Sequence, residues 1–292
     1  MKVAIYSRGL EEEHEFHLKI LLQALLDHNT DIQLYSSLAS PVIYNNYPSH
    51  KVKIFENAGQ LSDSVDCLIS LGGDGTMLDC ATLIRNKNIP LLGINFGRLG
   101  FLANIGKEEM PKAVEALAAG TFLIDQRTLI HAEADTPIFE DTPFCLNEFV
   151  IHKKDVASMI KIHTYLNGEF LNTYWCDGLI VSTPTGSTGY NLSCNGPILF
   201  PDTGSFVICP IAPHHLNVRP IVVPDNHIIS FEVESRSDEY MVSMDARREI
   251  LPKSVQVAVK KEDFTIGLVR LNENTFLETL RNKLTWGLDK RN

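Results

Sequence analysis

Residues 65–81, VDCLISLGGDGTMLDCA, determine how the rest of the chain is interpreted. The apolar run 65–71 leads into a turn with three glycines, Gly72-Gly73-Asp74-Gly75-Thr76. After the turn, Met77 and Ala81 stand four positions apart, on one face of a helix. The stretch therefore predicts a buried strand, a glycine-rich turn and a helix.

The glycine-rich turn has the properties of a phosphate site. Glycine adopts positive φ without strain and lets backbone N–H groups approach a ligand closely. A helix that starts after the turn favours anions, because its first amides have no partner within the helix. Asp74 is unusual there, since its carboxylate repels phosphate unless a divalent cation lies between them or the carboxylate accepts a proton. These properties indicate a kinase site with Asp74 as the proton acceptor.

The turn also has a plainer interpretation. Its five residues fit an ordinary loop in which Asp74 caps the helix. The position after a strand favours a functional site, because α/β folds bind ligands at the carboxyl ends of their strands. The turn is not a Walker A loop, since no Gly-Lys-Ser/Thr follows it, and it lacks the Gly-x-Gly-x-x-Gly pattern of dinucleotide-binding turns.

The composition is that of a globular protein with room for two domains, with 292 residues of which 44% are hydrophobic. The net charge is −10 and no long basic block occurs, which argues against nucleic acid or an anionic membrane as the main partner. No apolar run reaches membrane-spanning length, and the apolar start is too short for a signal peptide. The six cysteines lack CxxC spacing, so we expect reduced thiols in a cytoplasmic protein.

Residues 1–125 alternate between strand and helix patterns. We expect a Rossmann-like N-terminal domain, with a mostly parallel sheet covered by helices on both faces. The expected strands are residues 2–7, 31–35, 65–71 and 90–95, and the expected helices are residues 11–27, the segment after the glycine turn, and residues 108–119.

Residues 126–271 are rich in short strand patterns, which predict a C-terminal antiparallel β-rich domain, sandwich-like in form. Asn167-Gly168 between two of them predicts a two-residue type I′ hairpin. Residues 272–292 form a helical tail, with an amphipathic segment at 274–284, that we expect to return to the N-terminal domain. The expected strands are residues 128–134, 145–152, 160–166, 178–182, 206–211, 227–234, 240–244, 255–259 and 265–271.

Two polar segments within the β-rich part are further candidates. Residues 182–193, STPTGSTGYNLS, carry hydroxyls and amides that can bind ribose and phosphate oxygens, and Tyr190 can stack on a base. Their composition also fits a solvated loop. Asn147 and Glu148 interrupt the apolar run FCLNEFVIH, where a buried charge needs a partner or a ligand. The alternative is that Glu148 faces water.

Taken in order, these blocks resemble the NAD kinase family over nearly the full length of the chain. The Gly-Gly-Asp-Gly turn alone is shared with diacylglycerol, sphingosine and phosphofructokinase-type kinases. The block from Asn95 to Leu102 and the segment Thr183–Ser193 are far more specific. The matching blocks are Gly72–Thr76, Asn95-Phe96-Gly97 through Gly100-Phe101-Leu102, Asn147-Glu148, Asp177-Gly178, Thr183–Ser193, and Pro213-His214 leading to Arg219-Pro220.

The resemblance implies transfer of the γ-phosphate of ATP, with Mg or Mn, to the 2′-hydroxyl of the adenosine ribose of NAD, which yields NADP. It also implies an active site between the two domains and a homo-oligomer, either a dimer or a tetramer. By matching position, Asp74 is the proton acceptor, with Gly75 beside it. The residues expected to contact the dinucleotide are Asp74, Gly75, Asn147, Glu148, Asp177, Thr188, Gly189, Tyr190, Asn191, Leu192, Ser193, Ala212 and Arg247.

The chain departs from the family pattern at a few positions. Many members have Asp-Gly-Gln where this chain has Asp245-Ala246-Arg247, so the contact made by Arg247 is open. Trp175 and Ser158 stand where some bacterial members have basic residues, which leaves the preference for NAD or NADH open.

Two other functions fit the glycine turn. One is a lipid kinase, which needs an apolar cleft or a membrane-facing patch, and no such run flanks the turn. The other is a nucleotide sensor without catalysis, against which the presence of Asp74 argues.

Overall fold

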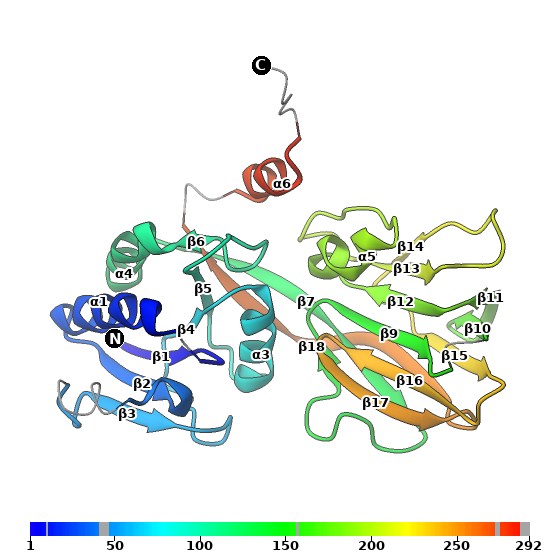
Figure 1. The fold of residues 1–292 in the computed structure, drawn as a ribbon, viewed down its shortest axis with the longest axis horizontal. Helices are drawn as coiled ribbons and strands as arrows, with labels where there is room; N and C mark the ends of the chain where they lie inside the picture. Colours follow the sequence, from blue (N-terminus) through cyan, green and yellow to red (C-terminus); the bar gives the residue numbers. More distant parts are fainter. Residues whose placement is uncertain (10, 41–46, 156–157, 272–274, 287–292) are drawn as a thin grey trace. The chain divides into compact units, whose positions relative to one another are not determined.

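The computed structural model describes residues 1–9, 11–40, 47–155, 158–271 and 275–286 (Figure 1). Contacts within the chain divide it into two units. Unit 1 consists of Met1–Gln126 and Ile266–Asn292, and unit 2 of Arg127–Thr265. The chain passes from unit 1 to unit 2 within β7 (Leu123–Ala134) and returns within β18 (Val257–Arg270).

Unit 1 is built on a parallel sheet in the order β5-β4-β1-β2-β3, which confirms the Rossmann-like fold. The short strand β6 pairs with β5. The sequence does not predict β3, because its four residues are too few to show a clear period. The strands are β1 (Lys2–Tyr6), β2 (Asp31–Tyr35), β3 (Val52–Phe55), β4 (Cys67–Leu71), β5 (Leu91–Asn95) and β6 (Ile105–Gly106).

Helices cover both faces of this sheet. α1 (Glu12–Asp27) and α4 (Met110–Ala119) share one apolar core with the side chains of one face. α3 (Asp74–Ile84) packs on the other face, where a Cβ on Gly93 of β5 would lie 2.7 Å from Sδ of Met77. Gly120, at φ +67°, ends α4 in the left-handed conformation that the sequence pattern predicts.

The C-terminal part of the described chain belongs to unit 1 from Ile266 onward. The sequence pattern places residues 266–271 with the β-rich domain, but Leu268 of β18 pairs in parallel with Leu91 of β5. In α6 (Phe276–Leu284), Lys283 donates a hydrogen bond to the carbonyl of Leu99 and lies 5.9 Å from the ring centroid of Phe101. No helix in the described ranges is long and apolar enough to cross a membrane.

Unit 2 consists of two packed sheets. One is fully antiparallel, in the order β14-β13-β12-β9-β16-β17, and the other runs β11-β10-β15-β18, with β7 paired to β18 and β8 to β7. Phe149 and Phe231, one from each sheet, stack in the core with ring centroids 6.2 Å apart. The β-rich, sandwich-like domain is thereby confirmed.

The strands of unit 2 that carry the site come from the antiparallel sheet. Its strands are β9 (Glu148–Lys153), β12 (Gly178–Ser182), β13 (Ser205–Ile211), β14 (Ile221–Pro224), β16 (Glu239–Met244) and β17 (Arg247–Pro252). The other sheet contains β7, β18, β8 (Phe144–Cys145), β10 (Ile160–Leu166), β11 (Glu169–Cys176) and β15 (Ile229–Glu234).

The structure corrects part of the strand prediction in unit 2. Residues 255–259 and 265–271 are not two strands, because β18 runs without interruption from Val257 to Arg270. The charged residues in its middle, 260–263, alternate between partly buried and exposed, and Lys261 pairs with Asp225 at 2.7 Å. The edge strands β11, β14 and β17 were also missed; β14 and β17 both end in proline and contain several exposed residues. Asn167 and Gly168, both at positive φ, form the predicted two-residue hairpin turn.

Candidate active site

Asp74 is the first residue of α3 and follows the turn that ends β4. Gly72 has φ +151°, and a Cβ on it would lie 2.4 Å from Oγ1 of Thr76, so the turn requires glycine there. The N–H of Thr76 donates to the carbonyl of Gly73 at 3.0 Å and closes the turn. The first amides of α3 therefore lie at the carboxyl end of β4, the usual ligand-binding edge of such a sheet.

Three backbone amides bind the carboxylate of Asp74. Oδ2 accepts the N–H of Phe101 at 2.9 Å, and Oδ1 accepts those of Leu102 and Ala103, both at 3.0 Å. These donors belong to the loop after β5, the strand that pairs in parallel with β4. The carboxylate is therefore held in one position by the backbone of a neighbouring loop.

Glycine is required in that loop because the carboxylate approaches it closely. A Cβ on Gly100 would lie 1.8 Å from Oδ1 of Asp74. Asn95 shapes the start of the loop, since its side chain donates to the carbonyl of Arg98 at 2.8 Å and accepts the N–H of Gly97 at 3.0 Å. The Asn95–Leu102 block, which the sequence analysis matched without a role, thus holds the predicted proton acceptor.

Arg8 lies beside the same turn and was missed by the sequence analysis. Its guanidinium donates to both carboxylate oxygens of Asp79, at 2.5 and 2.8 Å, and to the carbonyl of Gly75 at 3.0 Å. The side chain is still 52% exposed, so it presents positive charge next to the glycine turn. Arg8 follows β1, the parallel neighbour of β4, and its position at that strand end is the signal that could have identified it.

Asp245 organises the predicted site in unit 2. It lies at φ +52° in the turn between β16 and β17, and its carboxylate accepts backbone N–H groups from Leu146 at 3.0 Å, Asn147 at 2.8 Å and Glu148 at 3.3 Å. Burial raises the pKa of Asp245, while these three amides and the nearby Arg247 oppose the rise.

Glu148 is buried, with 9% of its surface exposed, and does not face water. Burial raises its pKa from 4.5 to about 8, the negative charge of Asp245 adds to the rise, and the backbone N–H of Tyr190 opposes it. Within the described residues, Oε2 of Glu148 and Oδ1 of Asn147 have no hydrogen-bond partner. Unpartnered buried acceptors of this kind are typical of a ligand site.

The glycines of the segment after β12 let it pack directly on Asn147 and Glu148. A Cβ on Gly186 would lie 2.1 Å from the carbonyl oxygen of Asn147, and one on Gly189 would lie 3.2 Å from Oε2 of Glu148. The N–H of Thr183 donates to the carbonyl of Asn147 at 2.9 Å. The polar segment is therefore a packed part of the site and not a solvated loop.

The rest of this segment forms the short helix α5 (Tyr190–Ser193). Tyr190 is 37% exposed and stacks on His152 of β9, with ring centroids 6.0 Å apart. Asn191 is fully buried, and its amide donates to the carbonyls of Ser187 and Pro197, both at 3.0 Å, so it braces the helix. Thr188, Gly189 and Leu192 are partly exposed and Ser193 is exposed.

Asp177 and Ala212 lie at the other end of β12. The carboxylate of Asp177 pairs with Nζ of Lys153 at 2.7 Å, and its N–H donates to the carbonyl of Ile211 at 3.0 Å. Ala212, which follows Ile211 in the chain, is exposed and has φ +43°, an uncommon conformation for alanine. Burial raises the pKa of Tyr190, and the negative charges of Glu148 and Asp177 add to the rise. Tyr190, the first residue of α5, is therefore close enough to respond to carboxylates at both ends of β12.

The side chain of Arg247 makes its contacts within the protein. Its guanidinium donates to Oγ1 of Thr142 at 2.7 Å and to the carbonyl of Phe144, and it lies 5.5 Å from the ring centroid of Phe139. These contacts brace residues 139–144, and a contact of Arg247 with a dinucleotide stays a prediction.

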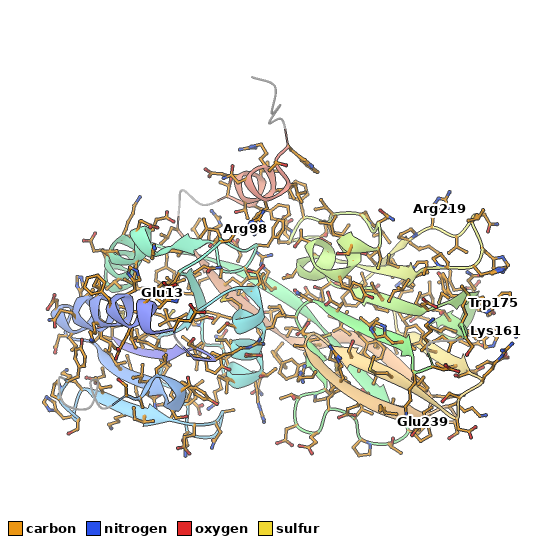
Figure 2. The ribbon with its side chains drawn as sticks, viewed as in Figure 1. Glu13, Arg98, Lys161, Trp175, Arg219 and Glu239 are labelled. Carbon is orange, nitrogen blue, oxygen red and sulfur yellow. The ribbon has the colours of Figure 1, made fainter. Side chains whose placement is uncertain are left out.

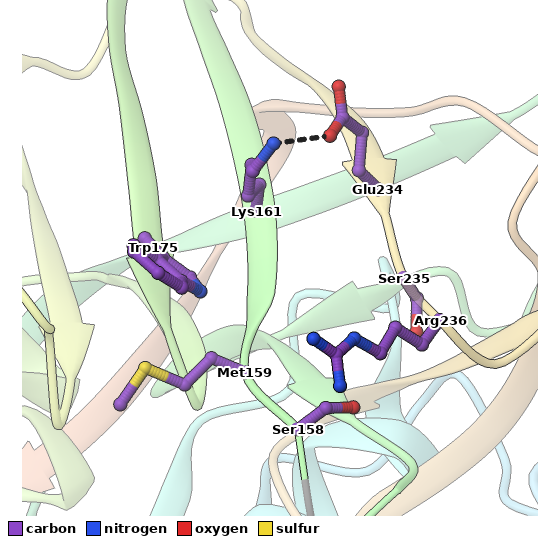
Figure 3. A pocket seen from close by; sticks show the side chains of 7 residues that line it. All are labelled: Ser158, Met159, Lys161, Trp175, Glu234, Ser235 and Arg236. Atoms are coloured by element: carbon purple, nitrogen blue, oxygen red, sulfur yellow. Dashed lines mark hydrogen bonds and ion pairs between the residues drawn. The ribbon is translucent and has the colours of Figure 1, made fainter.

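Trp175 and Ser158, where the chain departs from the family pattern, line one hollow of about 500 Å³ (Figures 2 and 3). Trp175 stacks on His214 with ring centroids 4.3 Å apart. Lys161 of β10, the cross-strand neighbour of Trp175, pairs with Glu234 at 2.9 Å, and Figure 3 shows Arg236 extending toward Ser158.

Metal ligands are sparse among the described residues. One group, Glu11, Glu13 and His14 at the start of α1, brings potential ligand atoms within 4.8 Å of one another, but none of these residues belongs to the predicted site. The glycine turn supplies one carboxylate, that of Asp74, and backbone amides bind both of its oxygens. A Mg or Mn ion at this turn therefore fits as the companion of substrate phosphates, the usual way in which Mg is bound in kinases.

Comparisons with known proteins agree with this arrangement. Two family models match the chain: the ATP-NAD kinase N-terminal domain over residues 11–122 and the ATP-NAD kinase C-terminal domain over residues 146–271. The chain is 46% identical to the NAD kinase of Cytophaga hutchinsonii and 44% identical to that of Flavobacterium psychrophilum, with 100% of each chain covered.

Two solved structures share the fold. Yeast NADH kinase, crystallised with NADH, superposes with a TM-score of 0.89 at 20% identity, covering 100% of this chain and 89% of that one. An NAD kinase from Archaeoglobus fulgidus, in complex with ATP, has a TM-score of 0.75 at 22% identity, covering 98% of this chain and 99% of that one. Because the family models match most of the chain and the curated relatives align over all of it, the chain belongs to the NAD kinase family of phosphotransferases.

Proposed function

We propose that this chain transfers the γ-phosphate of ATP to the 2′-hydroxyl of the adenosine ribose of NAD and so produces NADP. Family membership supports the activity, and one structural observation carries the mechanism. The carboxylate of Asp74 is fixed by three backbone amides at the start of α3, beside the glycine turn. A carboxylate held this firmly at an anion-binding helix terminus serves a specific chemical role.

Asp74 is the proposed proton acceptor. The ribose 2′-oxygen forms a bond to the γ-phosphorus, the bond from that phosphorus to the β–γ bridging oxygen breaks, and ADP leaves. The hydroxyl proton passes to the carboxylate of Asp74 as the new bond forms, because a neutral secondary hydroxyl is a poor nucleophile. The remaining acceleration comes from positioning and from neutralising phosphate charge.

The donor nucleotide is assigned to the glycine turn. ATP arrives with Mg or Mn on its phosphates, and the first amides of α3 supply N–H donors for them. The guanidinium of Arg8, anchored by Asp79 and half exposed, adds positive charge at the same place. These groups are all within unit 1.

The dinucleotide contacts are assigned to unit 2. Asn147 and Glu148 offer unpartnered buried oxygens, and Tyr190 offers a partly exposed ring face for a base. Asp177, Ala212 and Arg247 keep the roles that the family resemblance implies, as does the segment Thr188–Ser193. The proposed roles thus draw on residues of both units.

Two further properties belong to the proposal. We expect a homo-oligomer, either a dimer or a tetramer, as the resemblance implies, and a cytoplasmic location with reduced cysteines. All six cysteines are free in the structure, and five of them are buried. Light scattering of the purified protein at several concentrations tests the first expectation.

The decisive experiment is a product assay. The protein is incubated with ATP, Mg and NAD, and NADP is measured with an NADP-specific dehydrogenase, while phosphorus NMR identifies the 2′-phosphomonoester. Parallel incubations contain NADH or a diacylglycerol in place of NAD. NADP formation supports the proposal, whereas phosphorylation of the lipid alone, or release of ADP without NADP, contradicts it.

A further inference from the structure

Two neighbouring carboxyl groups in unit 2, those of Glu148 and Asp245, have very different partners. Asp245 accepts three backbone N–H groups, and its own N–H donates to the carbonyl of Glu148 at 3.1 Å. Glu148 is also buried, and its Oε2 has no hydrogen-bond partner within the described residues. One carboxyl group is thus well supplied with donors and the other is not.

The difference in donors affects how readily each group ionises. Burial raises the pKa of Asp245, but three amides and the nearby Arg247 stabilise its anion, and the negative charge of Asp245 adds to the rise that burial causes in the pKa of Glu148. Glu148 then has to ionise beside an existing negative charge in a buried position, with one amide, that of Tyr190, to favour the anion. Like charges at such a site do not both form at neutral pH.

The other groups around Glu148 do not compensate for this. Among the residues that the structure describes, no basic side chain contributes to the pKa shift of Glu148, whereas Arg247 acts on Asp245 and binds the loop 139–144. The ionisable neighbours from the remaining elements are the thiols of Cys145 and Cys194 and the phenol of Tyr190, whose pKa values are all raised, mainly by burial. These three groups are neutral wherever Glu148 is neutral.

We propose that Glu148 keeps its proton at neutral pH and donates this O–H in a hydrogen bond to a ring nitrogen or hydroxyl oxygen of the bound dinucleotide. The inference rests on the proposed function, because it takes the ligand to be NAD. An ionised Glu148 would repel the pyrophosphate of the ligand, whereas the neutral acid adds a donor and no charge.

The first test measures the carboxyl group without any ligand. Carbon-13 NMR of protein labelled at the glutamate side-chain carboxyl follows the titration of each glutamate, and Glu148→Gln identifies the resonance of Glu148. We expect its midpoint near pH 8. A midpoint for Glu148 below about pH 6 overturns the proposal, whatever the protein binds.

The second test measures NAD binding by calorimetry from about pH 6 to about pH 9.5. We expect the Kd of the wild type to rise about tenfold per pH unit above the midpoint of Glu148, since binding requires the proton. Glu148→Gln keeps a donor and cannot ionise, so its affinity stays flat over the same range. The matched control Glu169→Gln follows the wild type.

The outcomes separate this inference from the proposed function. Binding of NAD with the same affinity across the whole pH range, or the same slope in Glu148→Gln, overturns the donor role while NADP synthesis stands. A protein that binds no NAD at any pH refutes the proposed function and the donor role with it. If Glu148→Gln does not fold, the slope of the wild type decides.

Discussion

Asp74 in unit 1 and Glu148 in unit 2 are acidic residues with opposite surroundings. Asp74 accepts three N–H groups from the loop after β5. Glu148 is buried beside Asp245, and one of its oxygens has no partner within the described residues. Each is approached by a glycine, Gly100 in unit 1 and Gly189 in unit 2, so both sites are tightly packed.

The comparison shows that the donors around a carboxyl group set its chemical role. Backbone amides fix the position and direction of the Asp74 carboxylate, which suits a group that must face the ribose hydroxyl during phosphoryl transfer. Burial next to a second carboxylate raises the pKa of Glu148 and favours the neutral acid, which suits a group that donates a hydrogen bond. The residue type alone does not distinguish these roles.

The largest effect is expected from Asp74→Asn. The substitution keeps the shape of the side chain and removes the base, so kcat for NADP formation should fall by about 1000-fold. The Kd for NAD, measured by calorimetry, should stay within about threefold of the wild type, because the amide of Asn can still hydrogen-bond the 2′-hydroxyl and the other contacts assigned to NAD lie in unit 2. Near-normal turnover would refute the role of Asp74 as proton acceptor, and the contrast with Glu148 would no longer hold.

A smaller loss is expected from Gly100→Ala, which tests how the carboxylate is held. The new Cβ would overlap Oδ1 of Asp74, so the carboxylate or the loop must move, and kcat should fall by about 100-fold. Gly97→Ala in the same loop is the control, because a Cβ there would lie 3.7 Å from Oδ1 of Asn95, an ordinary contact. Equal activity of the two variants would show that the position of Asp74 does not matter.

The pH dependence of stability tests whether the pKa of Glu148 is raised in the folded protein. The pKa of Glu148 is higher in the folded state than in the unfolded chain, so the folded protein holds a proton that the unfolded chain releases between pH 4.5 and about 8. This stabilisation is complete at low pH and is lost as pH rises through that window, by at most about 1.4 kcal/mol per pH unit.

The measurement is urea unfolding without nucleotide. Between about pH 5 and about pH 8, the free energy of unfolding should decline more steeply in the wild type and in Glu169→Gln than in Glu148→Gln. Identical slopes in all three proteins would mean that Glu148 ionises normally and that the two acidic sites do not differ.

The smallest effect is expected from Arg8→Ala. Its guanidinium is half exposed, so solvent weakens its attraction for phosphate, and we expect the KM for ATP to rise about tenfold. The KM for NAD should change less than about twofold, since NAD contacts are assigned to unit 2. Arg8→Lys keeps the charge without the paired hydrogen bonds to Asp79, and its KM for ATP should lie between those of the wild type and Arg8→Ala. A change confined to the KM for NAD would contradict the assignment of the donor to the glycine turn.

Sequence reasoning predicts the features whose parts are adjacent in the chain. The glycine turn between β4 and α3, the Asn167-Gly168 hairpin and the C-terminal glycine of α4 all follow from local conformational preferences. It fails for β18, where charges on the exposed face of a strand look like an interruption. Edge strands such as β17 were missed because only one of their sides is paired.

The partners of the acidic residues could not be predicted in this way. Asp74 and its donors are 27 to 29 residues apart, Arg8 and Asp79 are 71 apart, and Asp245 and its donors are 97 to 99 apart. Each pair meets because strands distant in sequence are neighbours in a sheet, and a single sequence shows no signal for such pairing.

The amino-acid sequence was enough to establish the two-domain class and the family and to predict Asp74 as the proton acceptor, because each rests on short motifs with local geometry. The folded structure was needed to show which carboxyl group receives amide donors and which is buried beside another charge. Ionisation depends on the electrostatic environment within a few ångströms, and strand pairing between distant segments creates that environment.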